Sequence, residues 1–329
     1  MATLKKDGNV WRVQIYVKGQ RDSGTFSTKA QAQAWAAKRE TELREQHATG
    51  VVKGKTCRDA FERYEREVSR GKRGHRWEAL RLSAMADVAL DEVKFGDLKL
   101  CDLTAADIAR WRDSRLKTVL GSTVNREMNL LSHVLSTAQR EWGWIAESPT
   151  KAVRRPKDPP PRDRRITEDE IDRICLSLGF DESPVTTKSQ AVAVAFLFAI
   201  ETAMRAGEIC ALMPGDVSGR VAHLRITKNG AKRDVALSTR AVALLGLLPA
   251  TDGVLFGLSA ASLDALFRKA KERCMIADMT FHDTRHEAIT RLAQKLGVLD
   301  LARMVGHRDL RMLQIYYNET AAQIAARLD

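Results

Sequence analysis

The 329-residue chain lacks the features of small secreted proteins and of membrane proteins. Its five cysteines are scattered and form no C-x-x-C pair, which argues against a zinc site and a disulfide framework. No apolar run approaches the ~20 residues that span a bilayer. The first residues, MATLKKDGNVW, contain no apolar segment after their lysines, so no secretory signal is predicted. We therefore expect a cytoplasmic protein with reduced thiols, without a metal site and without a membrane partner.

Proline is scarce except in one stretch. Five of the eight prolines lie between Pro149 and Pro161, among several arginines and lysines. Because proline fixes φ and removes a hydrogen-bond donor, an extended linker is predicted over residues 151–165. Arg154 and Arg155 within it are candidates for DNA binding. A chain of this length is expected to form two or three domains, with one boundary at this linker.

An excess of negative charge is also absent, since the formal net charge is +12. Residues 1–165 contain 34 basic and 22 acidic residues, whereas residues 166–329 contain 20 of each. Lysine and arginine displace condensed counterions from phosphates, so a basic half is typical of a protein with a polyanionic partner. Charge that only solvates the surface explains the same imbalance about equally well.

Residues 1–50 have the pattern of a small separate unit. Residues 11–17, WRVQIYV, alternate between apolar and polar, which predicts a half-buried strand. Residues 22–26 are predicted to return as a second strand of a two- or three-stranded sheet, and Thr28 to cap a helix that backs it. A small sheet can read base edges in a major groove, although a purely stabilising appendage is the alternative. The DNA-binding candidates on its polar face and turn are Arg12, Gln14, Tyr16 and Lys18.

Residues 54–150 are predicted to form a basic helical bundle. Helix starts are expected at Thr56, at Thr104 and at Ser122, and the third helix carries apolar residues at spacings of three, four and seven. No catalytic constellation is present in this part of the chain.

The pattern from Ile166 onward is mixed α+β. Thr167 with Glu170 predicts a helical capping box, and residues 189–200 are apolar on nearly every side, which is typical of a central buried helix. Two strands are predicted on either side of Asn229-Gly230, and helices follow Phe281. The predicted fold class is therefore multidomain and mainly α with small β elements.

Three short pieces of this half have side chains suited to phosphate chemistry. Arg205 directly follows the buried helix, and Lys228 lies beside the predicted hairpin tip. His282 and Arg285, three residues apart, are expected to share a face at a helix N-terminus, where an imidazole and a guanidinium suit an oxyanion. Each piece alone is also explained by a surface arginine, a turn lysine or a capping histidine.

Two further pieces lie near the end of the chain. His307 follows a glycine, and Tyr316 and Tyr317 come nine and ten residues later. Asp309 is expected to cap the helix between them. A buried tyrosine on such a helix is normally a core residue, so either tyrosine in isolation carries little information.

In this order the five pieces resemble the tyrosine recombinases, the phage integrase family, over the whole second half. The family motif T-G-x-R-x-x-E-x-x-x-L corresponds to TAMRAGEICAL at 202–212, H-D-x-R-H is present at 282–286, and L-G-H stands as Val305-Gly306-His307. Ala203 replaces the usual glycine, and Leu313 replaces a common threonine. Tyr317 adds a second candidate nucleophile, but the nine-residue spacing favours Tyr316.

The resemblance extends to the first half and implies a domain plan. Residues 1–50 are similar to the arm-type DNA-binding domain of phage integrases, and residues 54–150 to their core-binding domain. Residues 166–329 would then be the catalytic domain.

The resemblance implies a site-specific DNA recombinase of phage or prophage type that integrates or excises a mobile element. It would act through a 3′-phosphotyrosine, without metal, ATP or any other cofactor. In the implied site Tyr316 is the nucleophile, Arg205, Arg285 and His307 stabilise the phosphorane, Lys228 protonates the leaving oxygen and His282 assists as acid or base. A type IB topoisomerase and a non-catalytic DNA-binding protein are the alternatives.

The implied partners are double-stranded attachment sites, with a homotetramer on DNA in the cytoplasm of a bacterial host. A DNA-bending host factor and a directionality factor are further candidates. Ala321, Ile324, Ala325 and Leu328 form an apolar stripe in the tail that a neighbouring protomer could bury.

Overall fold

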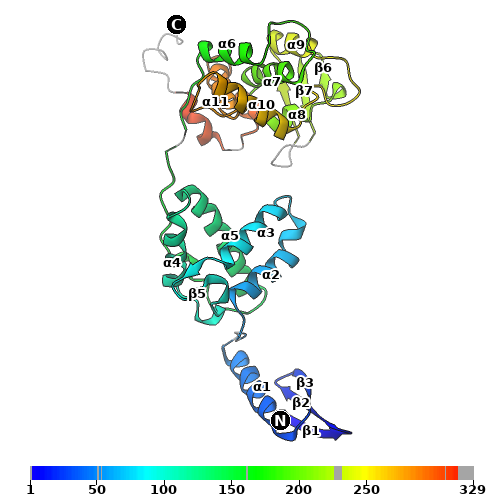
Figure 1. Cartoon of the computed structure of the whole chain (residues 1–329), viewed down its shortest axis with the longest axis vertical. Coiled ribbons are helices and arrows are strands. Elements are labelled where there is room, and N and C mark those ends of the chain that lie inside the picture. The colour runs from blue at the N-terminus through cyan, green and yellow to red at the C-terminus, as the bar shows by residue number, and fades with distance from the viewer. Residues whose placement is uncertain are drawn as a thin grey trace. The chain divides into compact units, whose positions relative to one another are not determined.

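The computed structural model describes residues 2–49, 52, 54–160, 162–225, 232–307 and 309–317. Tertiary contacts divide the chain into two compact units, Met1–Pro160 and Pro161–Asp329, and each is described by itself. The described elements are mainly helices with three small antiparallel sheets, which confirms the predicted fold class (Figure 1). Within these residues no helix is both long and apolar enough to cross a bilayer.

The first unit begins with a three-stranded sheet backed by one helix, as the pattern of residues 1–50 predicted. The sheet has the order β1-β2-β3, and the elements are β1 (Ala2–Asp7), β2 (Val10–Val17), β3 (Gln20–Phe26) and α1 (Lys29–Thr49). The alternation predicted for β2 is confirmed, because its inward side chains pack with α1 and its outward ones are exposed. The inward residues are Val13, Ile15 and Val17, and the outward residues are Arg12, Gln14 and Tyr16.

A helical bundle makes up the rest of this unit. Its elements are α2 (Cys57–Glu67), η1 (Ser69–Gly71), α3 (His75–Ala86), β4 (Ala89–Leu90), β5 (Val93–Lys94), η2 (Phe95–Asp97), η3 (Leu100–Asp102), α4 (Ala105–Leu116), α5 (Gly121–Arg140) and η4 (Pro149–Ala152). Thr56 and Thr104 each form the expected cap with an aspartate three residues later. Helix α5 begins at Gly121, one residue before the expected start at Ser122, and no side chain caps it. Helix α3 was not predicted, since its apolar residues form no single stripe.

The second unit is arranged around α7. Its elements are α6 (Glu168–Ser177), α7 (Lys188–Thr202), α8 (Ala206–Cys210), η5 (Pro214–Asp216), β6 (Val217–Ser218), β7 (Val221–Leu224), β8 (Arg233–Ala236), α9 (Thr239–Gly246), α10 (Ala260–Arg273), α11 (Asp283–Ala293), α12 (Val298–Val305) and η6 (Leu310–Tyr316). Helix α7 contacts α6, α8, α9, α10 and α11 and is buried over most of its length, so its predicted central place is confirmed. The capping box of Thr167 with Glu170 is also confirmed.

The segment that carries Tyr316 differs from expectation in its geometry. Asp309 caps it as predicted, because its side chain accepts a hydrogen bond from the backbone N–H of Arg311. The segment is a 3₁₀ helix and not an α-helix, which lets a seven-residue stretch place Leu313 in the core and Tyr316 beside α11.

Hydrogen bonds hold helix α11 against the polar segment that precedes α6. Arg162 donates two hydrogen bonds to the buried carboxylate of Asp283, at 2.7 and 2.9 Å. Arg165 binds the buried carboxylate of Glu287 in the same way, at 2.7 and 3.0 Å, and the backbone N–H of Ile166 adds a third bond at 3.1 Å. Each of these contacts joins residues more than 120 positions apart, so the segment fixes the start of the unit onto a helix near its end.

The Glu287 carboxylate is expected to make the second unit acid-sensitive. Burial would raise the pKa of Glu287, but hydrogen bonds from Arg165, Arg291 and Ile166 outweigh burial and lower it from 4.5 to about 2. The ionised form is therefore favoured in the folded state by roughly 3 kcal/mol, a contribution present above pH 4.5 and lost as the pH falls towards 2.

Urea unfolding of wild type and Glu287→Gln between pH 7 and pH 3 tests this expectation. The variant should be less stable by about 3–5 kcal/mol at pH 7, because removal of the charged Glu287 carboxylate leaves Arg165 without its ionic partner. The difference should narrow steadily below pH 4.5. A difference that stayed constant down to pH 3 would show that Glu287 is not the titrating group.

Candidate active site

Arg285 lies at the centre of the candidate site. It projects from α11, is 4% exposed, and donates hydrogen bonds to the backbone carbonyls of Ala203 and Val305. These carbonyls lie at the ends of α7 and α12, so one guanidinium joins three helices. Burial and the nearby Arg205 and Arg233 lower the pKa of Arg285 to about 10, which still leaves it charged at neutral pH.

His307 contacts this guanidinium through its Nε2 atom, at 3.3 Å from an Arg285 nitrogen. Burial and the three neighbouring arginines lower the pKa of His307 to about 4, so the ring is neutral at pH 7. Since arginine can only donate, Nε2 is the acceptor and Nδ1 carries the ring proton. Nδ1 is buried and has no hydrogen-bond partner among the described residues. The ring thus holds a hydrogen-bond donor with no partner among the described residues, next to three arginines.

Arg205 is positioned by a buried carboxylate. It caps α8, its backbone N–H donates to Glu208 at 2.8 Å, and its guanidinium contacts the same carboxylate at 3.1 Å. Glu208 also accepts two hydrogen bonds from Arg233, at 2.7 and 2.8 Å. Burial would raise the pKa of Glu208, but these arginines hold it below its usual range.

Sequence reasoning missed Arg233, which lies on β8 with only 7% of its side chain exposed. Its Nε donates to the carbonyl of Met304 at 3.0 Å, so it also fixes the end of α12. Period-two alternation could have identified it, because Arg233 shares a strand face with the buried Val235. Arg233 also explains why the L-G-H motif has a glycine in this chain. Gly306 has φ +72°, and a Cβ atom there would approach the Arg233 Cδ to 3.1 Å.

The site combines three guanidiniums with one carboxylate. Arg205, Arg233 and Arg285 surround Glu208 and His307, and electrostatic coupling among these groups is reflected in the depressed pKa values of Arg285 and His307. Such an excess of fixed positive charge in a partly buried site suits a phosphate group.

The two tyrosines at the end of η6 have different surroundings. The Tyr316 hydroxyl lies 3.0 Å from Nδ1 of His286. Burial raises the pKa of Tyr316, and the positive charge of the nearby Arg285 opposes that rise. The Tyr317 hydroxyl instead donates to the backbone carbonyl of Leu296 at 2.8 Å. Tyr316 therefore lies at the site, whereas Tyr317 supports the packing of the chain.

His282 and Arg285 both lie at the start of α11, as the motif spacing predicted, but their exposure differs. Arg285 is buried, whereas His282 is the exposed N-cap residue of the helix. The expected box at this helix start is present, because the carboxylate of Asp283 accepts from the N–H of Thr280 at 2.7 Å. The histidine that contacts the tyrosine is His286, which sequence reasoning included in the motif but did not single out.

Several predicted residues lie elsewhere or outside the described residues. Lys228 falls in the stretch 226–231, and the apolar stripe of the tail falls after residue 317, so the structure describes neither. Of the DNA-binding candidates on the small sheet, Arg12 pairs with Asp7 at 3.1 Å, Gln14 and Tyr16 lie on the exposed face, and Lys18 lies in the following turn. Arg154 is exposed, and Arg155 donates to the Asn129 side chain on α5 at 2.6 Å.

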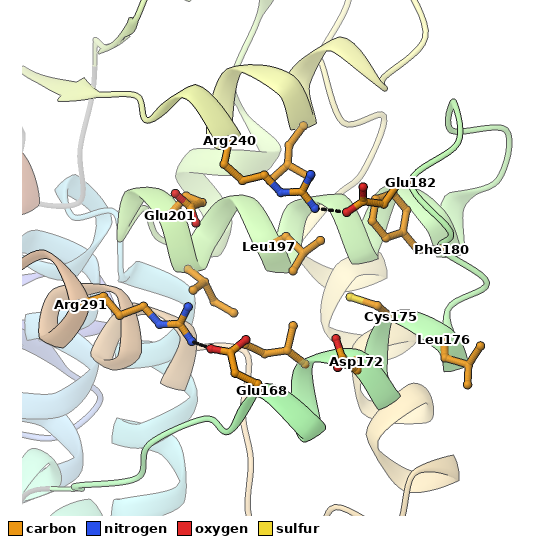
Figure 2. A pocket seen from close by; sticks show the side chains of 13 residues that line it. Glu168, Asp172, Cys175, Leu176, Phe180, Glu182, Leu197, Glu201, Arg240 and Arg291 are labelled. Atoms are coloured by element: carbon orange, nitrogen blue, oxygen red, sulfur yellow. Dashed lines mark hydrogen bonds and ion pairs between the residues drawn. The ribbon is translucent and has the colours of Figure 1, made fainter.

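A pocket of about 390 Å³ lies among α6, α7, α9 and α11 of the same unit. Figure 2 shows the apolar side chains Leu197 and Phe180 among its lining residues, together with two charged pairs that join Arg240 to Glu182 and Arg291 to Glu168. None of the described catalytic candidates lines it. The described residues of the motifs, Arg205, Arg285 and His307 among them, therefore lie in the arginine cluster and not at this pocket. In the part of the chain that the structure describes, no group of three or more metal-ligating side chains is gathered.

Comparison with known proteins places this geometry in a family. The model of the phage integrase family matches residues 164–323. A putative integrase/recombinase of Haemophilus influenzae is 39% identical over 96% of this chain and 87% of its own length. The shufflon-specific DNA recombinase of Escherichia coli is 38% identical over 82% of this chain and 71% of its own length.

Among solved structures, a lambda integrase tetramer bound to a Holliday junction has the same fold, with a TM-score of 0.65, 17% identity and 98% of each chain covered. The family match, the relatives and the ordered motifs agree with one another. This chain belongs to the phage integrase family, the tyrosine recombinases.

Proposed function

We propose that the protein is a site-specific DNA recombinase that integrates or excises a mobile element through a 3′-phosphotyrosine on Tyr316. The observation that carries the proposal is the placement of the Tyr316 phenol against His286, on the helix of the buried Arg285 whose charge acts on that phenol, in a chain of this family. Attack on a phosphodiester needs a nucleophile and neutralisation of the charge on the phosphorane. Tyr316 would supply the first and the arginines the second.

The proposed chemical step combines the positions of the described residues with the roles that the family resemblance implies. The Tyr316 oxygen forms a bond to phosphorus, and the bond between phosphorus and the 5′-oxygen breaks. Arg205 and Arg285 neutralise the non-bridging oxygens, and the free Nδ1–H of His307 donates a hydrogen bond to one of them. We assign protonation of the leaving 5′-oxygen to Lys228, with His282 assisting as acid or base. The ester retains the energy of the broken bond, so rejoining requires no ATP or other cofactor.

The domain plan belongs to the same proposal. Residues 1–50 would bind arm-type sites through the exposed face of β2, residues 54–150 would hold the core site, and residues 166–329 would cut it. A homotetramer on paired attachment sites would complete the reaction, as the tetramer of the structurally similar lambda integrase on its Holliday junction suggests. The apolar stripe in the tail is the proposed contact between protomers, and a DNA-bending factor and a directionality factor would set the direction.

A nicked duplex drawn from the DNA that flanks the coding gene tests the proposal. Incubation in excess EDTA without nucleotide should give a protein–DNA adduct that survives denaturation with SDS. DNA binding without an adduct would favour the non-catalytic alternative, and relaxation of any supercoiled plasmid regardless of sequence would favour a topoisomerase. An adduct that required Mg²⁺ would contradict the cofactor-free mechanism.

A further inference from the structure

The Tyr316 phenol has a defined hydrogen-bond partner that the family motifs do not assign. His286 lies on α11, directly after the central Arg285, and its ring centroid is 5.1 Å from that of Tyr316. Its Nδ1 atom is 3.0 Å from the phenol oxygen. The phenol and the imidazole are both partly buried, so this contact is less exposed to competition from water than a surface pair.

The other nitrogen of His286 is occupied as well. Nε2 lies 3.2 Å from a carboxylate oxygen of Asp163. A carboxylate only accepts, so Nε2 carries the proton, and Nδ1 must then accept from the Tyr316 hydroxyl. The three side chains form a chain of two hydrogen bonds that runs from phenol to imidazole to carboxylate. This order favours movement of the phenol proton to the imidazole, because the resulting cation would face Asp163.

The side chain of Asp163 is exposed, but residues before and after it in the sequence are anchored to α11. Arg162 is bound to Asp283 and Arg165 to Glu287, one turn apart on the helix that carries His286. The segment is thus fixed at residues 162 and 165, and it keeps Asp163 over the face of α11 where His286 emerges. A carboxylate with this support can orient a histidine despite its 91% exposure.

Charged groups from three elements act on this hydrogen-bonded triad. Asp163 and Arg165, which acts electrostatically on Asp163, come from the segment before α6. Tyr316 comes from η6, and Arg285 acts on it from α11. Arg285 stabilises a phenolate, and Asp163 stabilises an imidazolium, so both products of proton transfer face an opposite charge.

On the basis of the proposed function, we propose that His286, oriented by Asp163, is the base that takes the proton from Tyr316 as the tyrosine attacks DNA. The proton passes from the phenol oxygen to Nδ1, the phenol oxygen bonds to phosphorus, and the 5′-oxygen leaves with a proton from an acid on its own side. When the ester is resealed, the imidazolium returns its proton to the phenol. In this assignment the base for the nucleophile is His286, which leaves His282 the assisting role of an acid.

Single-turnover adduct formation on the nicked duplex between pH 6 and pH 9 tests this proposal. In His286→Asn the amide oxygen can replace Nδ1 as hydrogen-bond acceptor but cannot take a proton. Adduct formation should slow by about 100-fold at pH 7, and the loss should shrink as rising pH ionises the phenol. Asp163→Asn should slow the reaction several-fold with the same trend. Because this side chain is exposed, its variant tests the proposal even if His286→Asn folds poorly.

The chain offers a matched control in a second histidine–aspartate pair. His223 on β7 contacts Asp234 at 2.8 Å and lies outside the proposed machinery, so His223→Asn should react at the wild-type rate. A rate for His286→Asn within about twofold of wild type, or a loss equal at every pH, would overturn the role of His286. A wild-type protein without an adduct, or an adduct on Tyr316→Phe, would instead overturn the proposed function.

Discussion

Tyr316→Phe is expected to reduce adduct formation on nicked DNA to below detection while DNA binding remains near the wild-type level. The substitution removes only the oxygen that would form the ester to phosphorus. The ring, which packs beside His286, is retained, so the fold and the charge of the site should change little. Adduct formation on denaturing gels and retardation of the same duplex on native gels measure the two properties side by side.

Tyr317→Phe is the matched control for this prediction. Its hydroxyl donates to the carbonyl of Leu296, so its removal should cost about 1 kcal/mol of stability and leave the adduct in place. The opposite pattern, an inactive Tyr317→Phe beside an active Tyr316→Phe, would move the nucleophile to the second tyrosine. It would also require η6 to rotate on binding DNA.

Glu208→Ala is expected to lower both the stability of the second unit and its activity. The carboxylate is buried and compensates Arg205 and Arg233, and Arg285 lies close enough to interact with it. Without it, three guanidiniums remain close together, one of them buried without its ionic partner. Loss of one partner from a buried ion pair costs about 3–5 kcal/mol. Adduct formation should fall as well, because the backbone and side chain of Arg205 both lose their acceptor.

Urea unfolding and adduct formation test the Glu208 prediction together. Glu168→Ala is a suitable control, because that carboxylate is 75% exposed where it pairs with Arg291 and should contribute no more than about 1 kcal/mol. If Glu208→Ala unfolded at the wild-type urea concentration, the carboxylate would not be the group that holds the cluster together.

Local sequence rules predicted the features that depend on residues close together in the chain. The capping boxes at Thr56, Thr104 and Thr167 follow from spacings of three residues, and the burial of α7 follows from its composition. The strand alternation in β2 follows from a period of two. Each of these patterns is decided within one or two turns, so no knowledge of the fold was needed.

The details of the site depend on contacts between distant segments. His286 is 30 residues from Tyr316 and 123 from Asp163, and nothing in its own helix distinguishes it from a packing histidine. Arg233 meets Glu208 across 25 residues and Met304 across 71. The motifs therefore indicated which residue types the chemistry needs, but the tertiary fold decides that His286 faces the phenol and that His282 faces outward.

Localisation of the covalent bond tests the central claim most directly. Adduct formed on the nicked duplex can be digested with nuclease and trypsin, and the peptide that spans residues 312–327 can be sequenced by tandem mass spectrometry. The account predicts a nucleotide attached to Tyr316 and an unmodified Tyr317. A nucleotide on Tyr317 or on any other residue would contradict it.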